Sequence, residues 1–116
     1  MKTRKKSFSD ILEDTRIRTR RKLLKKIPSW AGVEGLEFPS SLSLEQCSSE
    51  ATATFKVRLI KEKFAHPDTI CDLTCGLGVD SWAFSAIASN GISFERNKDL
   101  SEAVRNNYSA LKASNI

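Results

Sequence analysis

Apolar side chains recur at helical spacing in the first quarter of the chain. Phe8, Ile11 and Leu12 stand at positions i, i+3 and i+4, which predicts a helix over residues 8–26. Pro28 follows shortly afterwards and cannot continue this helix, because proline has no backbone N–H group to donate.

A loop is predicted over residues 28–41, which contain two prolines and two glycines. Trp30, Leu36 and Phe38 make this segment too apolar for a free linker. We therefore expect the loop to be ordered and to pack against the rest of the protein.

A second helix is predicted to begin at Ser43. Ser43 and Gln46 have the spacing of a capping box, in which the Ser43 hydroxyl accepts a hydrogen bond from the Gln46 backbone N–H group. Every fourth residue is then apolar, which predicts one buried face made of Cys47, Ala51, Phe55 and Leu59. Pro67 ends this pattern.

From residue 69 the pattern alternates between short strands and helices. The expected elements are a strand over 69–73, a glycine turn over 74–78, a helix over 80–88 with Asp80 as N-cap, a strand over 91–95 and a helix over 99–113. The last helix has an apolar face at Leu100, Ala103, Val104, Tyr108 and Leu111. This order predicts parallel strands and an α/β fold, in which N-terminal helices precede the first βαβα unit of an incomplete Rossmann-like sheet.

Charge is distributed unevenly along the 116 residues, whose net charge is +5. Residues 1–26 hold 11 lysines and arginines against three acidic residues, a net charge of +8, whereas residues 27–116 carry −3. A basic arm of this kind can bind RNA phosphates, with Arg16, Arg18, Arg20, Arg21 and Lys22 as the candidate residues. A solvated segment without a partner is an equal alternative.

Composition predicts that the protein has neither a metal site nor a membrane partner. Three cysteines and one histidine are too few and too scattered for a structural zinc site, so we expect no metal and reduced thiols in the cytoplasm. No apolar run approaches the roughly 18 residues that span a bilayer, and no apolar stretch follows the charged N-terminus as in a secretory signal. We expect no membrane partner.

The residues with candidate chemistry follow the first predicted strand, in the sequence ICDLTCGLGVD of residues 70–80. Gly76 and Gly78 lack Cβ atoms, so a ligand can approach the backbone there, and the next helix offers free N–H groups. Asp72 can accept a hydrogen bond from an ammonium group. Glu95, at the end of the next strand, stands where such nucleotide sites receive ribose hydroxyls.

Two ligands suit this arrangement, and a purely structural turn is a third possibility. A dinucleotide site has the pattern G-x-G-x-x-G, but Ser81 stands at the third glycine position. S-adenosylmethionine has an amino acid end and no pyrophosphate. The spacing of Asp72, Gly76 and Gly78 therefore suits it better.

These residues resemble those of a known enzyme family. Residues 72–80, DLTCGLGVD, are similar to the first motif of class I S-adenosylmethionine-dependent methyltransferases. Residues 92–97, ISFERN, resemble the acidic motif of their second strand, and residues 99–111 resemble the helix that follows, in which Ala103 and Asn106 match an A-x-x-N pattern.

A narrower resemblance covers residues 21–116. The segments KIPSWA, residues 26–31, and LSLEQCSSEAT, residues 42–52, resemble a Bacteroidetes group of methyltransferases. This group is related to RNA cap guanine-N2 methyltransferases and carries a C-terminal THUMP-like domain. The resemblance implies an N-terminal fragment, with a basic helix and loop over residues 1–41 and the N-terminal part of the methyltransferase domain over 42–116.

The resemblance also implies a role for individual residues. Asp72, Gly76 and Gly78 would hold the methionine end of S-adenosylmethionine, Glu95 would hold its ribose, and Arg96 would flank its adenine. The cofactor-binding set is completed by Thr74 and Leu77 in the same turn. Polar residues before the first strand could face this pocket or simply begin a helix: Ser48, Ser49 and Thr52.

The activity implied is methyl transfer from S-adenosylmethionine to RNA, either rRNA or tRNA. The catalytic residues of the family are expected beyond residue 116, so the chain alone is expected to be inactive. The alternative is a non-catalytic module that binds a nucleotide or RNA.

Overall fold

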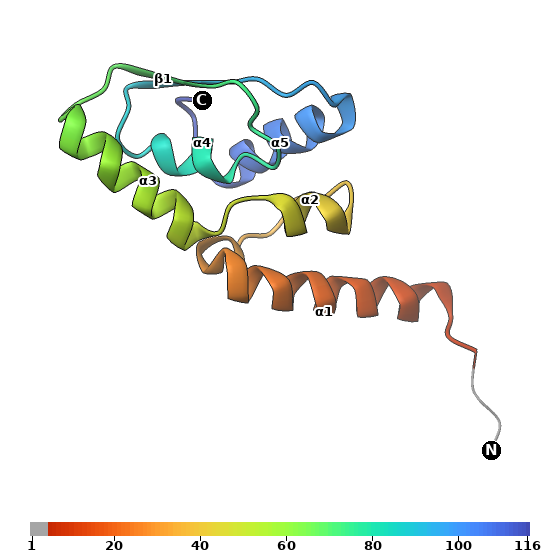
Figure 1. Ribbon diagram of the computed structural model, residues 1–116. Coiled ribbons are helices and arrows are strands. Elements are labelled where there is room, and N and C mark those ends of the chain that lie inside the picture. The colour runs from red at the N-terminus through yellow and green to blue at the C-terminus, as the bar shows by residue number, and fades with distance from the viewer. Residues whose placement is uncertain (1–4) are drawn as a thin grey trace.

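A computed structural model of the protein describes residues 5–116 (Figure 1). The elements in chain order are helix α1 (Phe8–Lys26), the short 3-10 helix η1 (Pro28–Trp30), α2 (Ser41–Gln46), α3 (Glu50–Lys63), strand β1 (Thr69–Asp72), α4 (Val79–Phe84), β2 (Asn90–Ser93) and α5 (Lys98–Ala110). The first four residues of the predicted basic segment lie outside the described part of the chain. No described helix is long and apolar enough to cross a membrane.

Helix α1 confirms the predicted bounds of 8–26. Its N-terminus has a capping box, because the Ser7 Oγ accepts from the Asp10 N–H at 3.2 Å and an Asp10 carboxylate oxygen accepts from the Ser7 N–H at 3.2 Å. Most of the helix projects away from the other elements, and only Leu23 is buried (Figure 1). The N-terminal apolar residues, which predicted the helix correctly, are exposed.

The loop after α1 is ordered, as its apolar content predicted. Trp30 is fully buried, and its ring packs edge-on against Trp82, with 5.7 Å between ring centroids. Ile27, Leu77 and Val79 are buried in the same core cluster. This cluster joins the end of α1 to the start of α4, so the N-terminal helix and the α/β part share one core.

The single helix predicted from Ser43 is wrong, because the segment forms two helices. The N-caps are Ser40 and Ser49, and the Ser43 hydroxyl donates to the Ser40 carbonyl oxygen at 2.6 Å instead of capping a helix. Ser49 begins the new helix α3, since its Oγ accepts from the Thr52 N–H group at 3.1 Å. Serine side chains compete in this way for backbone hydrogen-bonding groups, and the competition here divides the predicted helix into two.

The predicted buried face of this segment is also wrong. Phe55 and Leu59 are 54% and 49% exposed, and Ala53 is the buried residue of α3. Lys56, one turn after Ala53, forms an ion pair with Asp80 of α4, with 2.8 Å between Nζ and Oδ2. The side of α3 that carries Ala53 and Lys56 therefore faces α4, and the side that carries Phe55 and Leu59 is exposed.

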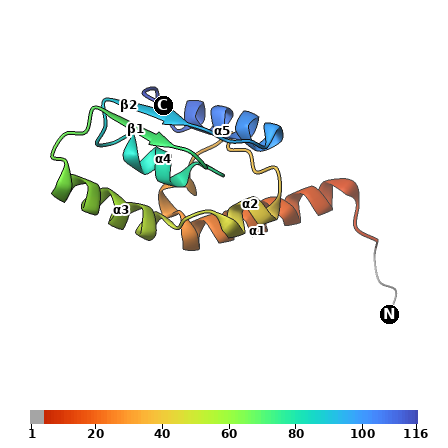
Figure 2. The same cartoon turned by 45° about the horizontal axis from the view of Figure 1, so that its top comes forward.

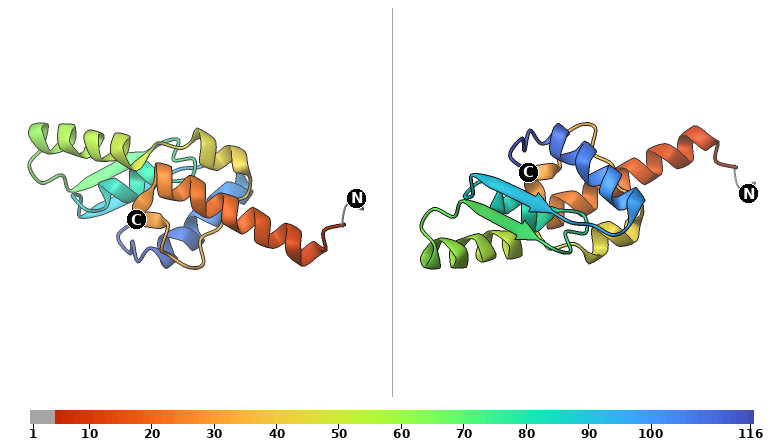
Figure 3. Two further views of the ribbon diagram at one scale, coloured as in Figure 1. Left: turned by 90° about the horizontal axis from the view of Figure 1, so that it is seen from below. Right: turned by 90° about the horizontal axis from the view of Figure 1, so that it is seen from above.

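Strands β1 and β2 are parallel, which confirms the βαβ prediction (Figure 2). The register pairs Thr69 with Asn90 and Asp72 with Ser93. Helix α4 lies behind the sheet in the right-hand view of Figure 3, and none of the described helices covers the face in front. Ile92 of β2 and Phe94, just after the strand, are 46% and 51% exposed.

Helix α4 is shorter than predicted and begins earlier. Gly78 is its N-cap, with a φ of +86°, and Asp80 lies within the first turn instead of capping it. The helix ends at Phe84, before the predicted end at residue 88. Helix α5 has the predicted face, since Ala103, Val104 and Tyr108 are buried.

Candidate functional site

The parallel pairing brings the ends of both strands together at one edge of the sheet. The Phe94 N–H donates to the Asp72 carbonyl oxygen at 2.8 Å, and the Cys75 N–H donates to the Phe94 carbonyl oxygen at 2.9 Å. The glycine turn after β1 is therefore bonded directly to the chain leaving β2. This is the edge at which open α/β sheets bind ligands.

The Glu95 carboxylate bridges the glycine turn and the start of α5. Its Oε1 accepts from the Gly76 N–H at 3.0 Å, and its Oε2 accepts from the Asn97 N–H at 2.8 Å. The side chain is half-buried. Because a carboxylate has about four lone-pair positions, it can accept further hydrogen bonds from a ligand.

Asp72 is held in place by two hydrogen bonds. Its Oδ1 accepts from the Thr74 N–H at 3.2 Å, and its Oδ2 accepts from the Ser81 hydroxyl at 2.9 Å. Ser81 is buried, and it occupies the third glycine position of a dinucleotide pattern. No sequence signal connects Ser81 with Asp72, because only the fold of the turn brings residues nine positions apart into contact.

The two glycines of the turn serve different purposes. Gly76 has a φ of +55°, and an added Cβ would meet no other atom within 4 Å, so this side of the backbone is open. At Gly78, with its φ of +86°, an added Cβ would lie only 2.9 Å from Cζ of Tyr108. The space expected for a ligand beside both glycines is therefore present only at Gly76, since Tyr108 occupies it at Gly78.

The surroundings of Tyr108 and Cys75 raise the pKa of both side chains. The Tyr108 hydroxyl donates to the Gly78 carbonyl oxygen at 3.1 Å, and burial raises the pKa of Tyr108 to about 12. Burial, with Asp72 and Glu95 nearby, raises the pKa of the Cys75 thiol to about 11. A thiol with so high a pKa is a poor nucleophile at neutral pH.

Two pockets flank the turn, and Cys75 lines both. One has a volume of about 170 Å³ and lies between the turn and the break before α3; it is lined by Thr74, Gly76, Leu77, Asp80 and Ser48, among others. The other, of about 250 Å³, is lined by residues that include Glu95, Ser93, Arg105 and Tyr108. Each is smaller than the roughly 300–1,000 Å³ of typical small-molecule sites, so neither would enclose a whole ligand of that size.

Of the polar residues before β1, one faces the pocket and two begin a helix, which are the two roles considered from the sequence. The Ser48 hydroxyl faces the first pocket and donates to Asp80 Oδ2 at 3.0 Å. Ser49 and Thr52 instead form the start of α3. Arg96 is exposed just beyond Glu95.

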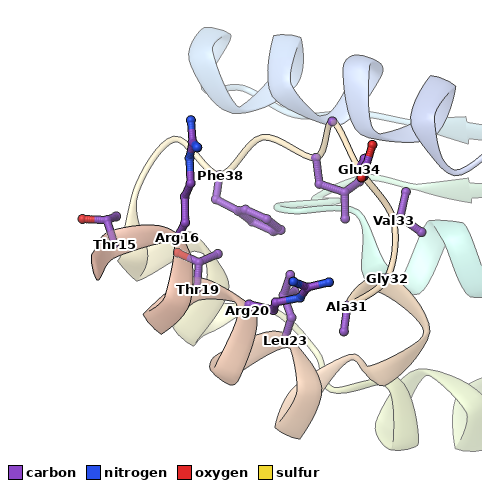
Figure 4. A pocket seen from close by; sticks show the side chains of 12 residues that line it. Thr15, Arg16, Thr19, Arg20, Leu23, Ala31, Gly32, Val33, Glu34 and Phe38 are labelled. Atoms are coloured by element: carbon purple, nitrogen blue, oxygen red, sulfur yellow. The ribbon is translucent and has the colours of Figure 1, made fainter. Parts of the chain in front are cut away.

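The candidate RNA-binding residues lie on α1 rather than beside the glycine turn. Arg16 and Arg20 line a groove of about 720 Å³ between α1 and the loop of residues 31–38 (Figure 4). Lys22 forms an ion pair with Glu45, with 3.2 Å between Nζ and Oε1.

Within residues 5–116 no group of three or more His, Cys, Asp or Glu side chains could hold a metal ion.

Comparison with solved structures finds a similar protein, a "putative methyltransferase" from Porphyromonas gingivalis. The sequences are 41% identical, the TM-score is 0.73, and the match covers 84% of this chain. This likeness supports a methyltransferase family for the chain. The chain spans 23% of the Porphyromonas methyltransferase. No protein-family model matches the chain, and the comparison with curated proteins finds no match.

Proposed function

We propose that this chain is the cofactor-binding part of an S-adenosylmethionine-dependent methyltransferase that acts on rRNA or tRNA. The observation that carries the cofactor assignment is the Glu95 carboxylate, which accepts from the Gly76 N–H and has lone pairs left for a ligand. The similarity to a methyltransferase supports the reaction class. The finer relationship, to the Bacteroidetes group with a THUMP-like domain, rests on the sequence resemblance.

The residues at the sheet edge fit this cofactor. Gly76 leaves open space beside the backbone, and Thr74 and Leu77 line the adjoining pocket. Asp72 has lone pairs left after its two hydrogen bonds, so it can accept from the ammonium group of the methionine end. Arg96 is exposed at the position proposed to flank the adenine.

A dinucleotide fits less well. Its third glycine permits a close approach of helix and strand, and the Ser81 side chain takes that place here. Ser81 also donates to Asp72, which fixes the carboxylate at the end of β1. An acid at this position suits a positively charged amino group better than it suits a pyrophosphate.

When bound, S-adenosylmethionine supplies a methyl group on a positively charged sulfur. The residues of this chain bind and orient: Asp72 accepts from the ammonium group, and Glu95 accepts from the ribose hydroxyls. The hydrogen bonds from Gly76 and Asn97 hold the Glu95 carboxylate in position before the ligand arrives. Such pre-organisation reduces the free energy spent on ordering the site.

Calorimetry with S-adenosylhomocysteine and with NAD tests the cofactor proposal. We expect the chain to bind S-adenosylhomocysteine more tightly than NAD. Glu95→Gln should weaken binding about tenfold or more, because hydrogen bonds to a charged group are the stronger ones. Glu102→Gln, an exposed acid on α5, is the matched control and should bind as the unaltered chain does.

The outcomes separate the candidate functions. Preference for NAD would favour the dinucleotide site, and binding of neither ligand would refute the cofactor proposal. RNA binding with no affinity for S-adenosylhomocysteine would favour a non-catalytic RNA-binding module instead.

A further inference from the structure

We propose that the groove between α1 and residues 31–38 binds one unpaired nucleotide of a single-stranded RNA. The base stacks on Phe38, and the flanking phosphates contact Arg16 and Arg20. This inference rests on the proposed RNA substrate, and it assigns that role to one groove instead of the whole basic helix.

The α1 side of the groove offers positive charge in a regular arrangement. Arg16 and Arg20 lie one helical turn apart, about 6 Å along the axis, so both side chains leave the same face of α1. In Figure 4 the Arg16 side chain extends past Phe38, and the Arg20 side chain runs over the helix toward Ala31. No described ion pair engages either of them, whereas Lys22 is paired with Glu45. Thr19, between them in sequence, adds a hydroxyl to the same wall.

The loop side of the groove offers an aromatic surface. Figure 4 shows the Phe38 ring directed into the space above α1, with Leu23 on the floor. Phe38 is half-buried, so the core supports the ring while part of it remains accessible. Single-stranded nucleic acids are typically bound by such a pairing of aromatic side chains with a positively charged groove.

Three hydrogen bonds anchor the loop to α5. Both atoms of the Asn107 side-chain amide bond the backbone of Glu37, the residue before Phe38, and Asn106 donates to the Gly35 carbonyl oxygen at 2.7 Å. The aromatic wall is therefore formed before any ligand binds. Glu34 places a negative charge on this wall and would repel a phosphate, so a bound phosphate would lie nearer the arginines.

Fluorescence anisotropy of the full chain with a labelled eight-nucleotide RNA tests the groove. Phe38→Leu keeps an apolar side chain but removes the stacking surface, and it should weaken binding at least about fivefold. An oligonucleotide of the same length without bases should bind the Phe38→Leu variant and the unaltered chain equally. A duplex of the same sequence should bind more weakly than the single strand, because its bases are already paired.

Charge position is tested with two matched double variants. Arg16→Gln/Arg20→Gln should reduce the slope of log affinity against log salt by about 1.4, as expected for two lost contacts to a single strand. Lys61→Gln/Lys63→Gln removes the same charge from exposed lysines of α3, outside the groove, and it should leave the slope nearly unchanged. Thermal melting of every variant separates loss of binding from loss of folding.

The failure of this inference can be told apart from the failure of the RNA proposal. If the unaltered chain binds RNA but Phe38→Leu has no effect and the two double variants are equally impaired, the groove assignment is wrong and RNA binding stands. If the unaltered chain binds no RNA, both are refuted. Tight binding of adenosine monophosphate with no gain for the oligonucleotide would make this a free-nucleotide site and overturn the RNA assignment.

Discussion

The Asn107 side chain pairs with the backbone of Glu37 in both directions across 70 residues of sequence. Its Oδ1 accepts from the Glu37 N–H at 2.6 Å, and its Nδ2 donates to the Glu37 carbonyl oxygen at 2.8 Å. Asn107 is fully buried, and its amide makes the two hydrogen bonds that the Glu37 backbone would otherwise make with water. This pair joins the loop that carries Phe38 to the last turn of α5.

Removing this pair should destabilise the fold. We expect Asn107→Ala to lower the free energy of unfolding by about 2–3 kcal/mol, because two backbone groups of Glu37 lose their partners. Asn106→Ala is the control: Asn106 is less buried and makes one bond to that loop, so its loss should cost about 1 kcal/mol or less. Urea unfolding measures both, and equal effects would contradict the argument.

The two glycines of the turn should respond differently to alanine. Gly76→Ala should cost about 1 kcal/mol of stability, because only the positive φ opposes it. Gly78→Ala should cost at least about 2 kcal/mol more, since its Cβ would also collide with Tyr108. The part of the Gly78→Ala cost that comes from this collision should largely disappear when Tyr108 is replaced by leucine. A double-mutant cycle by urea unfolding that shows no coupling between the two substitutions would refute the collision.

Gly76→Ala should also separate stability from ligand binding. Its added methyl group would project into the open space proposed for the cofactor. We expect weaker S-adenosylhomocysteine binding by calorimetry in a variant that still unfolds cooperatively. Unchanged affinity would show that the ligand does not approach this side of the turn.

Stability should fall in alkaline solution because of Tyr108. The pKa of this hydroxyl is about 12 in the folded protein, against about 10 in an unfolded chain, so the folded state holds its proton more tightly. The stabilisation is complete below pH 10 and is lost between pH 10 and 12, with about 1.4 kcal/mol lost by pH 11. The Tyr108→Phe variant lacks the titrating hydroxyl. Urea unfolding of both chains from pH 9 to 11 should therefore show that the difference between their free energies of unfolding becomes smaller as pH rises.

The cysteines should differ in reactivity toward alkylating reagents. Cys71 is exposed, whereas Cys75 is half-buried and its pKa is raised to about 11 by burial first and by the nearby carboxylates second. Because the thiolate is the reacting form, iodoacetamide at pH 8 should label Cys71 well before Cys75. Peptide mass spectrometry after timed labelling measures both, and comparable rates would contradict the environment described for Cys75.

Much of the secondary structure could be predicted from local signals. Periodicity located α1 to the residue, and alternation with a glycine turn located β1, β2 and their parallel pairing. The same signals failed at Ser43, where a continuous apolar spacing of four outweighed the serines that break the helix. Phe55 and Leu59 fitted a buried face by spacing, but the ion pair of Lys56 with Asp80 accompanies a different orientation of α3.

The sequence by itself located the strands to within two residues, because hydrogen bonding and side-chain spacing within a few residues set each element. Strand β2 ends at Ser93, two residues before its predicted end at Glu95. The sequence also placed Asp72 and Glu95 at one sheet edge once the strands were parallel. Only the tertiary structure decided that Tyr108 fills the space beside Gly78, that Ser81 holds Asp72, and that Phe38 faces the arginines of α1. These relationships join residues 9, 18, 22 or 30 positions apart, and packing of separate elements creates them.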